Sequence, residues 1–200
     1  PGFGQSQVPN TTYDVDDYKN IVYEFVKKLC LEKINLIGHS FGGKIAIKFA
    51  AQYPERISGL ILCSAAGIRP KRGTWYFLMR IGAKIGKRLS FFPFYSFLRK
   101  FFYRFVSRTQ DYLKVSGIMK ETFIKIIDED LSSLLSEISV PTLIIWGKKD
   151  KITPIGNAYL MQKEIPNSSL KIIPEAGHRI NIEKPDELAK LITSFIQSRN

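Results

Sequence analysis

Gly38-His39-Ser40-Phe41-Gly42 lies between two segments of different periodicity and is the most informative part of this sequence. A short apolar run at residues 33–37 predicts a strand, and helical periodicity follows at residues 41–53, before Pro54. A serine flanked by glycines two residues away is typical of a tight strand-to-helix turn, because small neighbours let the chain fold back sharply. Such a turn lifts the serine hydroxyl clear of the sheet beside a helix N-terminus. Ser40 is therefore the predicted nucleophile.

Strands and helices alternate along the rest of the chain. Continuous apolar runs predict further strands at residues 58–64, 140–146 and 169–173. Helical periodicity is present at residues 14–31, 118–135, 155–164 and 185–197. Apolar runs without alternation are typical of strands that are buried on both faces. We therefore predict an α/β fold in which helices cover both faces of a mostly parallel sheet.

A serine nucleophile needs a base, and the sequence contains two histidines, His39 and His178. His39 directly precedes Ser40, so we expect its side chain to leave the turn in another direction and to pack beside the sheet. His178 follows the last predicted strand, in a loop from which a side chain can reach across the strand ends. His178 is therefore the predicted base.

Asp150 is the predicted carboxylate that orients His178. Ser40, Asp150 and His178 all follow predicted strands, at the carboxyl ends where parallel sheets hold their sites. Asp186 is better explained as a first-turn residue of the helix at 185–197. The chain order serine, aspartate, histidine predicts acyl transfer by a catalytic triad.

The glycine spacing is also compatible with two other interpretations. One is a glycine-rich connection without any chemistry. The other is a phosphate loop, because residues 38–44 match most of the pattern G-x-x-x-x-G-K-[ST]. Ile45 stands where that loop has a hydroxyl for magnesium, which argues against a nucleotide site.

Length and composition are those of one ordinary globular domain, with 200 residues, 44% hydrophobic and 24% charged. No apolar run is long enough to span a bilayer, and we expect a cytoplasmic location, with peripheral membrane attachment as the alternative. The chain starts at Pro1, so we expect a fragment or processed product whose true N-terminus lies upstream. Cys30 and Cys63 lie in apolar stretches and are expected to be buried, reduced thiols.

These motifs make the sequence similar to the α/β-hydrolase superfamily, in the branch of lid-bearing serine esterases, cofactor-free haloperoxidases and C–C bond hydrolases. The likeness also includes residues 1–6 (PGFGQS), residues 141–147 (PTLIIWG) and Gly177-His178. The resemblance implies an N-terminally truncated hydrolase core at residues 1–68 and 136–200, with a helical cap inserted at residues 69–135. It implies an esterase that needs no metal or cofactor. A C–C bond hydrolase or a cofactor-free perhydrolase with the same triad is the alternative.

The resemblance further implies an oxyanion hole to which this chain contributes the backbone N–H of Phe41. The family's second donor and first strands would lie before Pro1 and are absent from this chain. Because one such donor is worth about 10²–10³ in rate and the first strand would have an uncovered edge, we expect the 200 residues alone to fold poorly and hydrolyse esters weakly. Relatives that hydrolyse haloalkanes or epoxides have an aspartate in place of Ser40, which argues against both activities.

Residues 69–108 carry the charge imbalance, with 11 Lys/Arg and no Asp or Glu, against 19 basic and 18 acidic residues elsewhere. Twelve aromatic residues share this segment, at spacings that predict amphipathic helices of a lid. The lid could cover a pocket for a small-molecule ester, or bind anionic membranes and admit lipid-like esters. A non-catalytic membrane-binding protein on a hydrolase scaffold stays open as well. The segment lacks a nucleic-acid recognition motif, and we expect no nucleic-acid partner.

Overall fold

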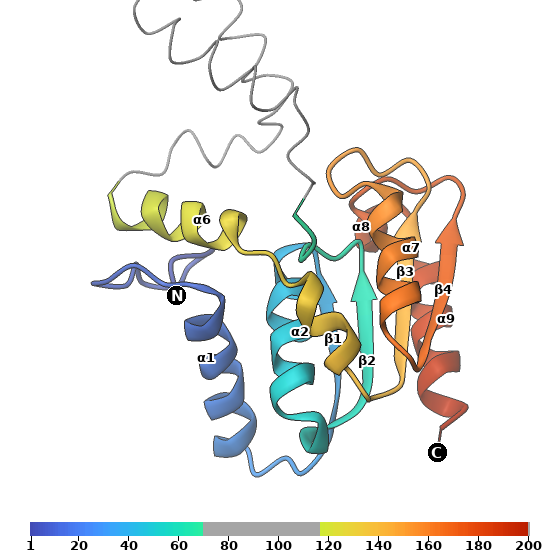
Figure 1. The fold of residues 1–200 in the computed structure, drawn as a ribbon, viewed down its shortest axis with the longest axis horizontal. Helices are drawn as coiled ribbons and strands as arrows, with labels where there is room; N and C mark the ends of the chain where they lie inside the picture. The colour runs from blue at the N-terminus through green and yellow to red at the C-terminus, as the bar shows by residue number, and fades with distance from the viewer. Residues whose placement is uncertain (70–116, 200) are drawn as a thin grey trace, which may run out of the picture. The chain divides into compact units, whose positions relative to one another are not determined.

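A computed structural model describes residues 1–69 and 117–199 (Figure 1). Two compact units make up the chain, Pro1–Thr12 with Pro70–Ile124, and Tyr13–Arg69 with Lys125–Asn200. The predicted lid helices lie outside the described residues, so the cap boundaries of 69 and 135 stay a prediction. Within the described ranges, the helices are too short or too polar to cross a bilayer.

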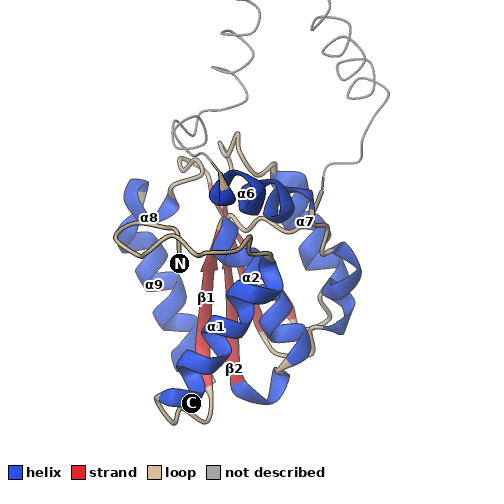
Figure 2. Ribbon diagram, turned by 90° about the vertical axis from the view of Figure 1, so that its left-hand side faces the viewer, coloured by secondary structure: helices blue, strands red, loops and turns tan. Residues whose placement is uncertain are grey.

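The second unit is built on a parallel sheet. In the part of the chain that the structure describes, the strand order is β1 (Ile34–His39), β2 (Ile57–Cys63), β3 (Thr142–Gly147) and β4 (Ser168–Ile173). All neighbouring pairs are parallel, so the four carboxyl ends meet at one edge. Helices lie on both faces of the sheet (Figure 2). The predicted fold class is confirmed.

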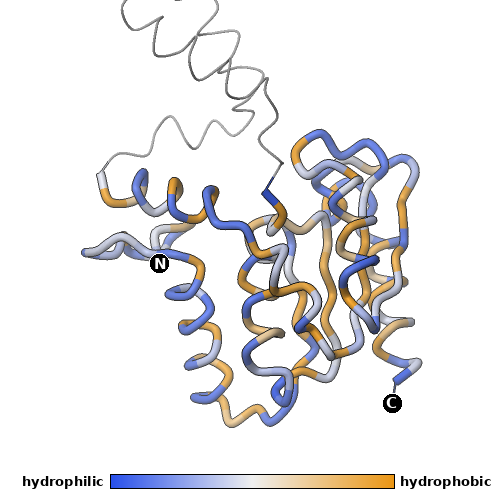
Figure 3. Tube along the Cα trace, viewed as in Figure 1, coloured by the Kyte–Doolittle hydropathy of each residue, from blue (hydrophilic) through white to orange (hydrophobic). Residues whose placement is uncertain are grey.

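Alternate side chains of the central strands enter two separate apolar layers. One layer lies against α2 (Phe41–Gln52) and α7 (Ile155–Glu164), and it receives Leu60, Leu62, Ile144 and Trp146 from the sheet. The other lies against α9 (Pro185–Gln197), and it receives Ile61, Cys63, Leu143 and Ile145. Figure 3 shows the resulting run of hydrophobic residues along the central strands. Burial on both faces explains why these strands read as continuous apolar runs.

Helix α1 (Val15–Lys28) begins where the sequence predicts it, because Asp14 and Asp17 form a reciprocal cap. The Asp14 carboxylate accepts from the Asp17 N–H at 3.0 Å, and the Asp17 carboxylate accepts from the Asp14 N–H at 2.9 Å. The helix ends earlier than expected, before Cys30, whose φ is 53°. Cys30 is exposed in the turn that follows, so the expectation of a buried thiol is wrong there, whereas Cys63 is buried within β2.

The helix expected at residues 118–135 is interrupted. It consists of α6 (Ile118–Asp128) and, after a break, the 3-10 helix η2 (Ser132–Glu137). Asp130 explains the break, because its carboxylate accepts from the Ser132 N–H at 3.0 Å and so starts a new turn. Among residues 1–69 and 117–199, two short elements lie outside the predicted set, η1 (Pro54–Arg56) and α8 (Ile180–Glu183).

Candidate active site

Ser40 occupies a strained turn between β1 and α2. Its φ of 52° and ψ of −117° lie in a region that side-chain-bearing residues rarely adopt. A Cβ on Gly38 would lie 2.6 Å from the Gly42 carbonyl oxygen, which explains the first glycine of the motif. Gly42 itself has open space around it, and Gly43 is the crowded position, 2.4 Å from the Ala65 Cβ. The expectation that both glycines flanking Ser40 relieve crowding is therefore correct for Gly38 and wrong for Gly42.

The structure brings the three predicted triad residues together. Ser40 Oγ lies 2.9 Å from His178 Nε2, and His178 Nδ1 lies 2.9 Å from Asp150 Oδ2. An ionised carboxylate can only accept, so the partners assign the proton to Nδ1 and leave Nε2 to accept from the serine hydroxyl. This is the tautomer that a general base for Ser40 requires.

Asp150 is held in its ionised form by its hydrogen bonds. Burial by itself raises the pKa of this carboxyl, but His178, the Thr153 hydroxyl and the N–H groups of Ile152 and Thr153 outweigh burial and lower the pKa to about 2. The Thr153 hydroxyl lies 2.6 Å from Asp150 Oδ2 and 3.2 Å from His178 Nδ1. Sequence reasoning missed Thr153, although its place three residues after Asp150, in a turn, is a usable signal.

His39 does not leave the turn as expected. Its Nε2 lies 2.8 Å from the carbonyl oxygen of His178, and the two imidazole rings are 5.1 Å apart. The expectation of a residue that packs beside the sheet is corrected to one that bonds to the His178 backbone, because β1 and the loop after β4 approach each other at the carboxyl edge of the sheet. A carbonyl oxygen only accepts, so His39 Nε2 carries a proton.

Phe41 is the first residue of α2 and directly follows Ser40. Its ring packs edge to face on the ring of Tyr18, with centroids 5.2 Å apart. The N–H groups of a first helical turn point out of the helix and favour negative charge near them. This position suits the oxyanion role that the sequence predicts for the Phe41 N–H, and that role stays a prediction.

Known proteins are similar to this chain along its length. Residues 1–185 match the family described as serine aminopeptidase, S33. The chain belongs to this α/β-hydrolase family. The human monoacylglycerol lipase ABHD6 is 28% identical over 92% of this chain, which covers 61% of the lipase. The 2-hydroxy-6-oxo-6-phenylhexa-2,4-dienoate hydrolase of Comamonas testosteroni is 27% identical over the whole chain and 75% of that enzyme.

Solved structures agree with the α/β-hydrolase assignment. The esterase from Exiguobacterium antarcticum superposes with a TM-score of 0.73 at 26% identity, over 98% of this chain and 78% of the esterase. The chain spans less than two thirds of the first curated relatives, 61% and 64% of their lengths. The α/β-hydrolase resemblance of the sequence is confirmed.

In this S33 chain, Lys44 stabilises the structure through hydrogen bonds to the backbone, and this argues against the phosphate-loop alternative. It is buried, and its Nζ donates to the carbonyl oxygens of Glu129, at 2.7 Å, and of Ile126. Burial lowers the pKa of Lys44. A lysine whose ammonium is engaged by backbone carbonyls is unsuited to phosphate binding, and Ile45 already argued in that direction.

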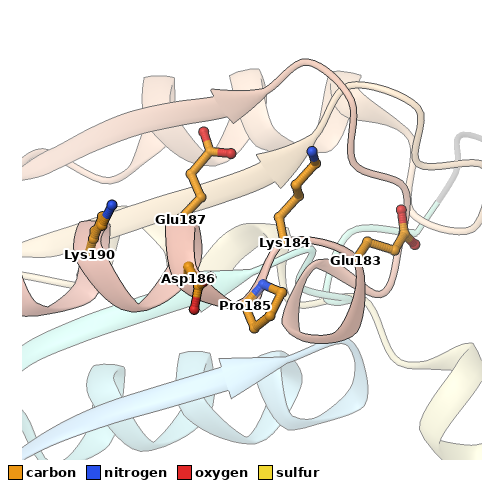
Figure 4. Close-up of a pocket in the computed structure, with 6 residues that line it drawn as sticks. All are labelled: Glu183, Lys184, Pro185, Asp186, Glu187 and Lys190. Carbon is orange, nitrogen blue, oxygen red and sulfur yellow. The ribbon is translucent and has the colours of Figure 1, made fainter.

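Two surface hollows among the described residues have linings that do not include Ser40, Asp150 or His178. One is lined by residues that precede β1 and β2, Glu32, Lys33, Glu55 and Arg56, and so lies at the opposite edge of the sheet. The other is lined by residues of the junction between α8 and α9, including Lys184 and Glu187 (Figure 4). Residues 1–69 and 117–199 contain no group of three side chains suited to a metal ion.

Proposed function

We propose that the protein is a serine hydrolase that cleaves carboxylic esters through Ser40, His178 and Asp150. The observation that carries the proposal is the unbroken hydrogen-bond chain from Ser40 Oγ through both nitrogens of His178 to Asp150, with 2.9 Å at each step. The family assignment and the lipase and esterase relatives support an ester as the substrate.

The first half of the reaction acylates the serine. Ser40 Oγ forms a bond to the ester carbonyl carbon while its proton moves to His178 Nε2. The carbonyl oxygen becomes an oxyanion, and the Phe41 N–H donates to it. The C–O bond to the alcohol then breaks, and the proton on Nε2 passes to the departing oxygen.

The second half releases the acid. Water attacks the acyl carbon, gives a proton to His178 Nε2, and Ser40 Oγ recovers that proton as the acyl bond breaks. Asp150 holds Nδ1–H throughout and stabilises the imidazolium that forms twice in the cycle. Its low pKa supports this role, because the carboxylate stays charged at neutral pH.

A fluorophosphonate probe tests the nucleophile in the whole protein. We expect the wild type to be labelled and Ser40→Ala to be unlabelled. Asp150→Asn should label far more slowly, because loss of a triad carboxylate costs about 10⁴ in rate. Ser198→Ala, in the exposed turn after α9, is the matched control and should label like the wild type. Labelling of Ser40→Ala would contradict the assignment.

We also propose a lipid-like ester as the substrate and an anionic membrane surface as the partner of residues 69–108. The support is the monoacylglycerol lipase relative and the 11 basic residues of that segment. Flotation with vesicles that contain or lack anionic lipid measures the second part. Binding that needs anionic lipid and weakens with salt is expected, and equal binding to neutral vesicles would contradict it.

C–C bond hydrolysis is a second candidate, favoured by the Comamonas testosteroni relative, which matches the whole chain. It would use the same nucleophile and base, so the fluorophosphonate probe cannot distinguish it from ester hydrolysis. Parallel turnover measurements with p-nitrophenyl butyrate and with a 2-hydroxy-6-oxo-dienoate do distinguish them. Faster turnover of the dienoate would replace the ester proposal.

A further inference from the structure

The loop that presents His178 is anchored near its start by Ala176, which is buried and whose carbonyl oxygen accepts from the Lys149 N–H at 2.9 Å. It joins β4, which ends at Ile173, to the short helix α8, which begins at Ile180. The imidazole of His178 must stay within hydrogen-bond distance of both Ser40, which follows β1, and Asp150, which follows β3. A misplacement of about 1 Å at a reacting group can cost about 10²-fold in rate. Whatever fixes the backbone of this loop therefore bears on the reaction.

Glu183 holds the two amides that flank His178. The Gly177 N–H donates to Glu183 Oε2 at 2.6 Å, and the Arg179 N–H donates to Glu183 Oε1 at 3.2 Å. Hydrogen bonds to an ionised carboxylate are the stronger kind, and the two together fix position and orientation. In Figure 4 the Glu183 side chain points toward this loop, whereas Glu187 and Lys190 extend from α9.

His39 holds the carbonyl of the same residue. Its Nε2–H donates to the His178 oxygen at 2.8 Å, although 138 residues separate the two histidines. His39 is the last residue of β1 and the neighbour of Ser40. The strand that leads into Ser40 is therefore hydrogen-bonded directly to the backbone that carries His178.

We propose that His39 and Glu183 are positioning residues that clamp the backbone of the His178 loop, His39 at the carbonyl and Glu183 at the amides on either side. The proposal rests on the proposed function of Ser40 and His178. Neither residue contacts the reacting atoms. Each acts by fixing where the imidazole of His178 stands relative to Ser40 and Asp150.

The first test compares matched pairs of variants in the whole protein, with p-nitrophenyl butyrate as substrate. His39→Phe keeps a ring without a donor, and Glu183→Leu removes both acceptors. We expect each to lower kcat about 10- to 100-fold with KM little changed. His39→Gln keeps an N–H donor and Glu183→Gln keeps an acceptor oxygen, so both should recover most of kcat. Glu187→Leu, an exposed residue of α9, is the control and should match the wild type.

The second test does not depend on turnover. Hydrogen exchange of the peptide that covers residues 174–182 should be faster in His39→Phe and Glu183→Leu, and unchanged in Ser40→Ala and Glu187→Leu. An inactive wild type whose loop still loosens in the two clamp variants would contradict the proposed function but leave the clamp standing. Unchanged exchange, or faster exchange with unaltered kcat in an active protein, would overturn the positioning role. Equal losses of kcat in the Phe and Gln variants would also overturn it.

Discussion

Asp150 keeps its charge at a buried position because four hydrogen bonds reach its two carboxylate oxygens. Two come from the backbone N–H groups of Ile152 and Thr153, and two from the side chains of Thr153 and His178. Together these hydrogen bonds lower the pKa of Asp150 by more than burial raises it, from its ordinary 3.8 to about 2. The folded state thus binds the proton of Asp150 less readily than the unfolded chain does.

This depressed pKa predicts a pH dependence of stability. The contribution of Asp150 is present above about pH 4 and is lost as the pH falls from 4 through 2. Between pH 4 and 2, the free energy of unfolding of the wild type should fall by about 2 kcal/mol more than that of Asp150→Asn. Urea titrations at several pH values measure this. Asp186→Asn, exposed on α9, should follow the wild type, and parallel curves for wild type and Asp150→Asn would contradict the prediction.

Gly147 marks a close approach of backbone to backbone beside the His178 loop. A Cβ there would lie 2.2 Å from the Gly177 oxygen and 2.5 Å from the Ala176 oxygen, and neither is a flexible side-chain end. We expect Gly147→Ala to lower the free energy of unfolding by about 1–3 kcal/mol. Gly156→Ala, which has open space in α7, is the control and should lose nothing. Equal urea midpoints for the two variants would rule this explanation out.

Two lysines of helix α2 bond the helix to neighbouring segments of the chain. Its first turn follows Ser40, and one turn on, Lys44 donates to carbonyl groups at the end of α6. Lys48 makes ion pairs with Asp16 of α1 and with Glu129. Helix α2, which directly follows Ser40, is therefore bonded both to α1 and to the segment at the end of α6.

Removal of the Lys44 ammonium should loosen that connection. Lys44→Met keeps the length of the side chain but leaves the Ile126 and Glu129 carbonyls without this donor, at an expected cost of about 1–3 kcal/mol. The amides of residues 126–131 should exchange faster in the variant. Lys33→Met, at an exposed site before β1, is the matched control and should stay within about 0.5 kcal/mol of the wild type. Wild-type exchange rates in Lys44→Met would show that other contacts hold this segment.

At the scale of the whole molecule, we expect the two apolar layers on either side of the sheet to unfold as one cooperative unit. Ile144 and Ile145 are adjacent on β3, fully buried, and belong to opposite layers. Ile144→Ala and Ile145→Ala should each cost about 2–5 kcal/mol and lower the midpoint of one shared transition. Far-ultraviolet circular dichroism and tryptophan fluorescence should give coincident curves. Ile182→Ala, 66% exposed, should change little, and separate transitions for the two layers would contradict a single unit.

Strand positions and the order of candidate residues could be predicted because they depend on local pattern. Each of the four strands is a run of six or seven residues, and Ser40, Asp150 and His178 each follow one of them. The ends of helices are harder to predict from the sequence. The break after α6 depends on Asp130 bonding to Ser132, and the pattern of apolar residues runs through it undisturbed.

Sequence alone determined the α/β architecture, the strand-to-helix turn at Ser40 and the chain order of the candidate residues Asp150 and His178 after it, because periodicity and glycine spacing act within a few residues. Tertiary structure decided the rest. It placed the two ring nitrogens of His178 at 2.9 Å from Ser40 Oγ and from Asp150 Oδ2. It also left Cys30 exposed and bonded the buried Lys44 to backbone carbonyl groups. Above all, it turned His39 toward the carbonyl of His178, although β1 and β4 are not neighbours in the sheet. The contact forms because the strands are parallel, so the loop after β4 starts at the same end of the sheet as the turn after β1.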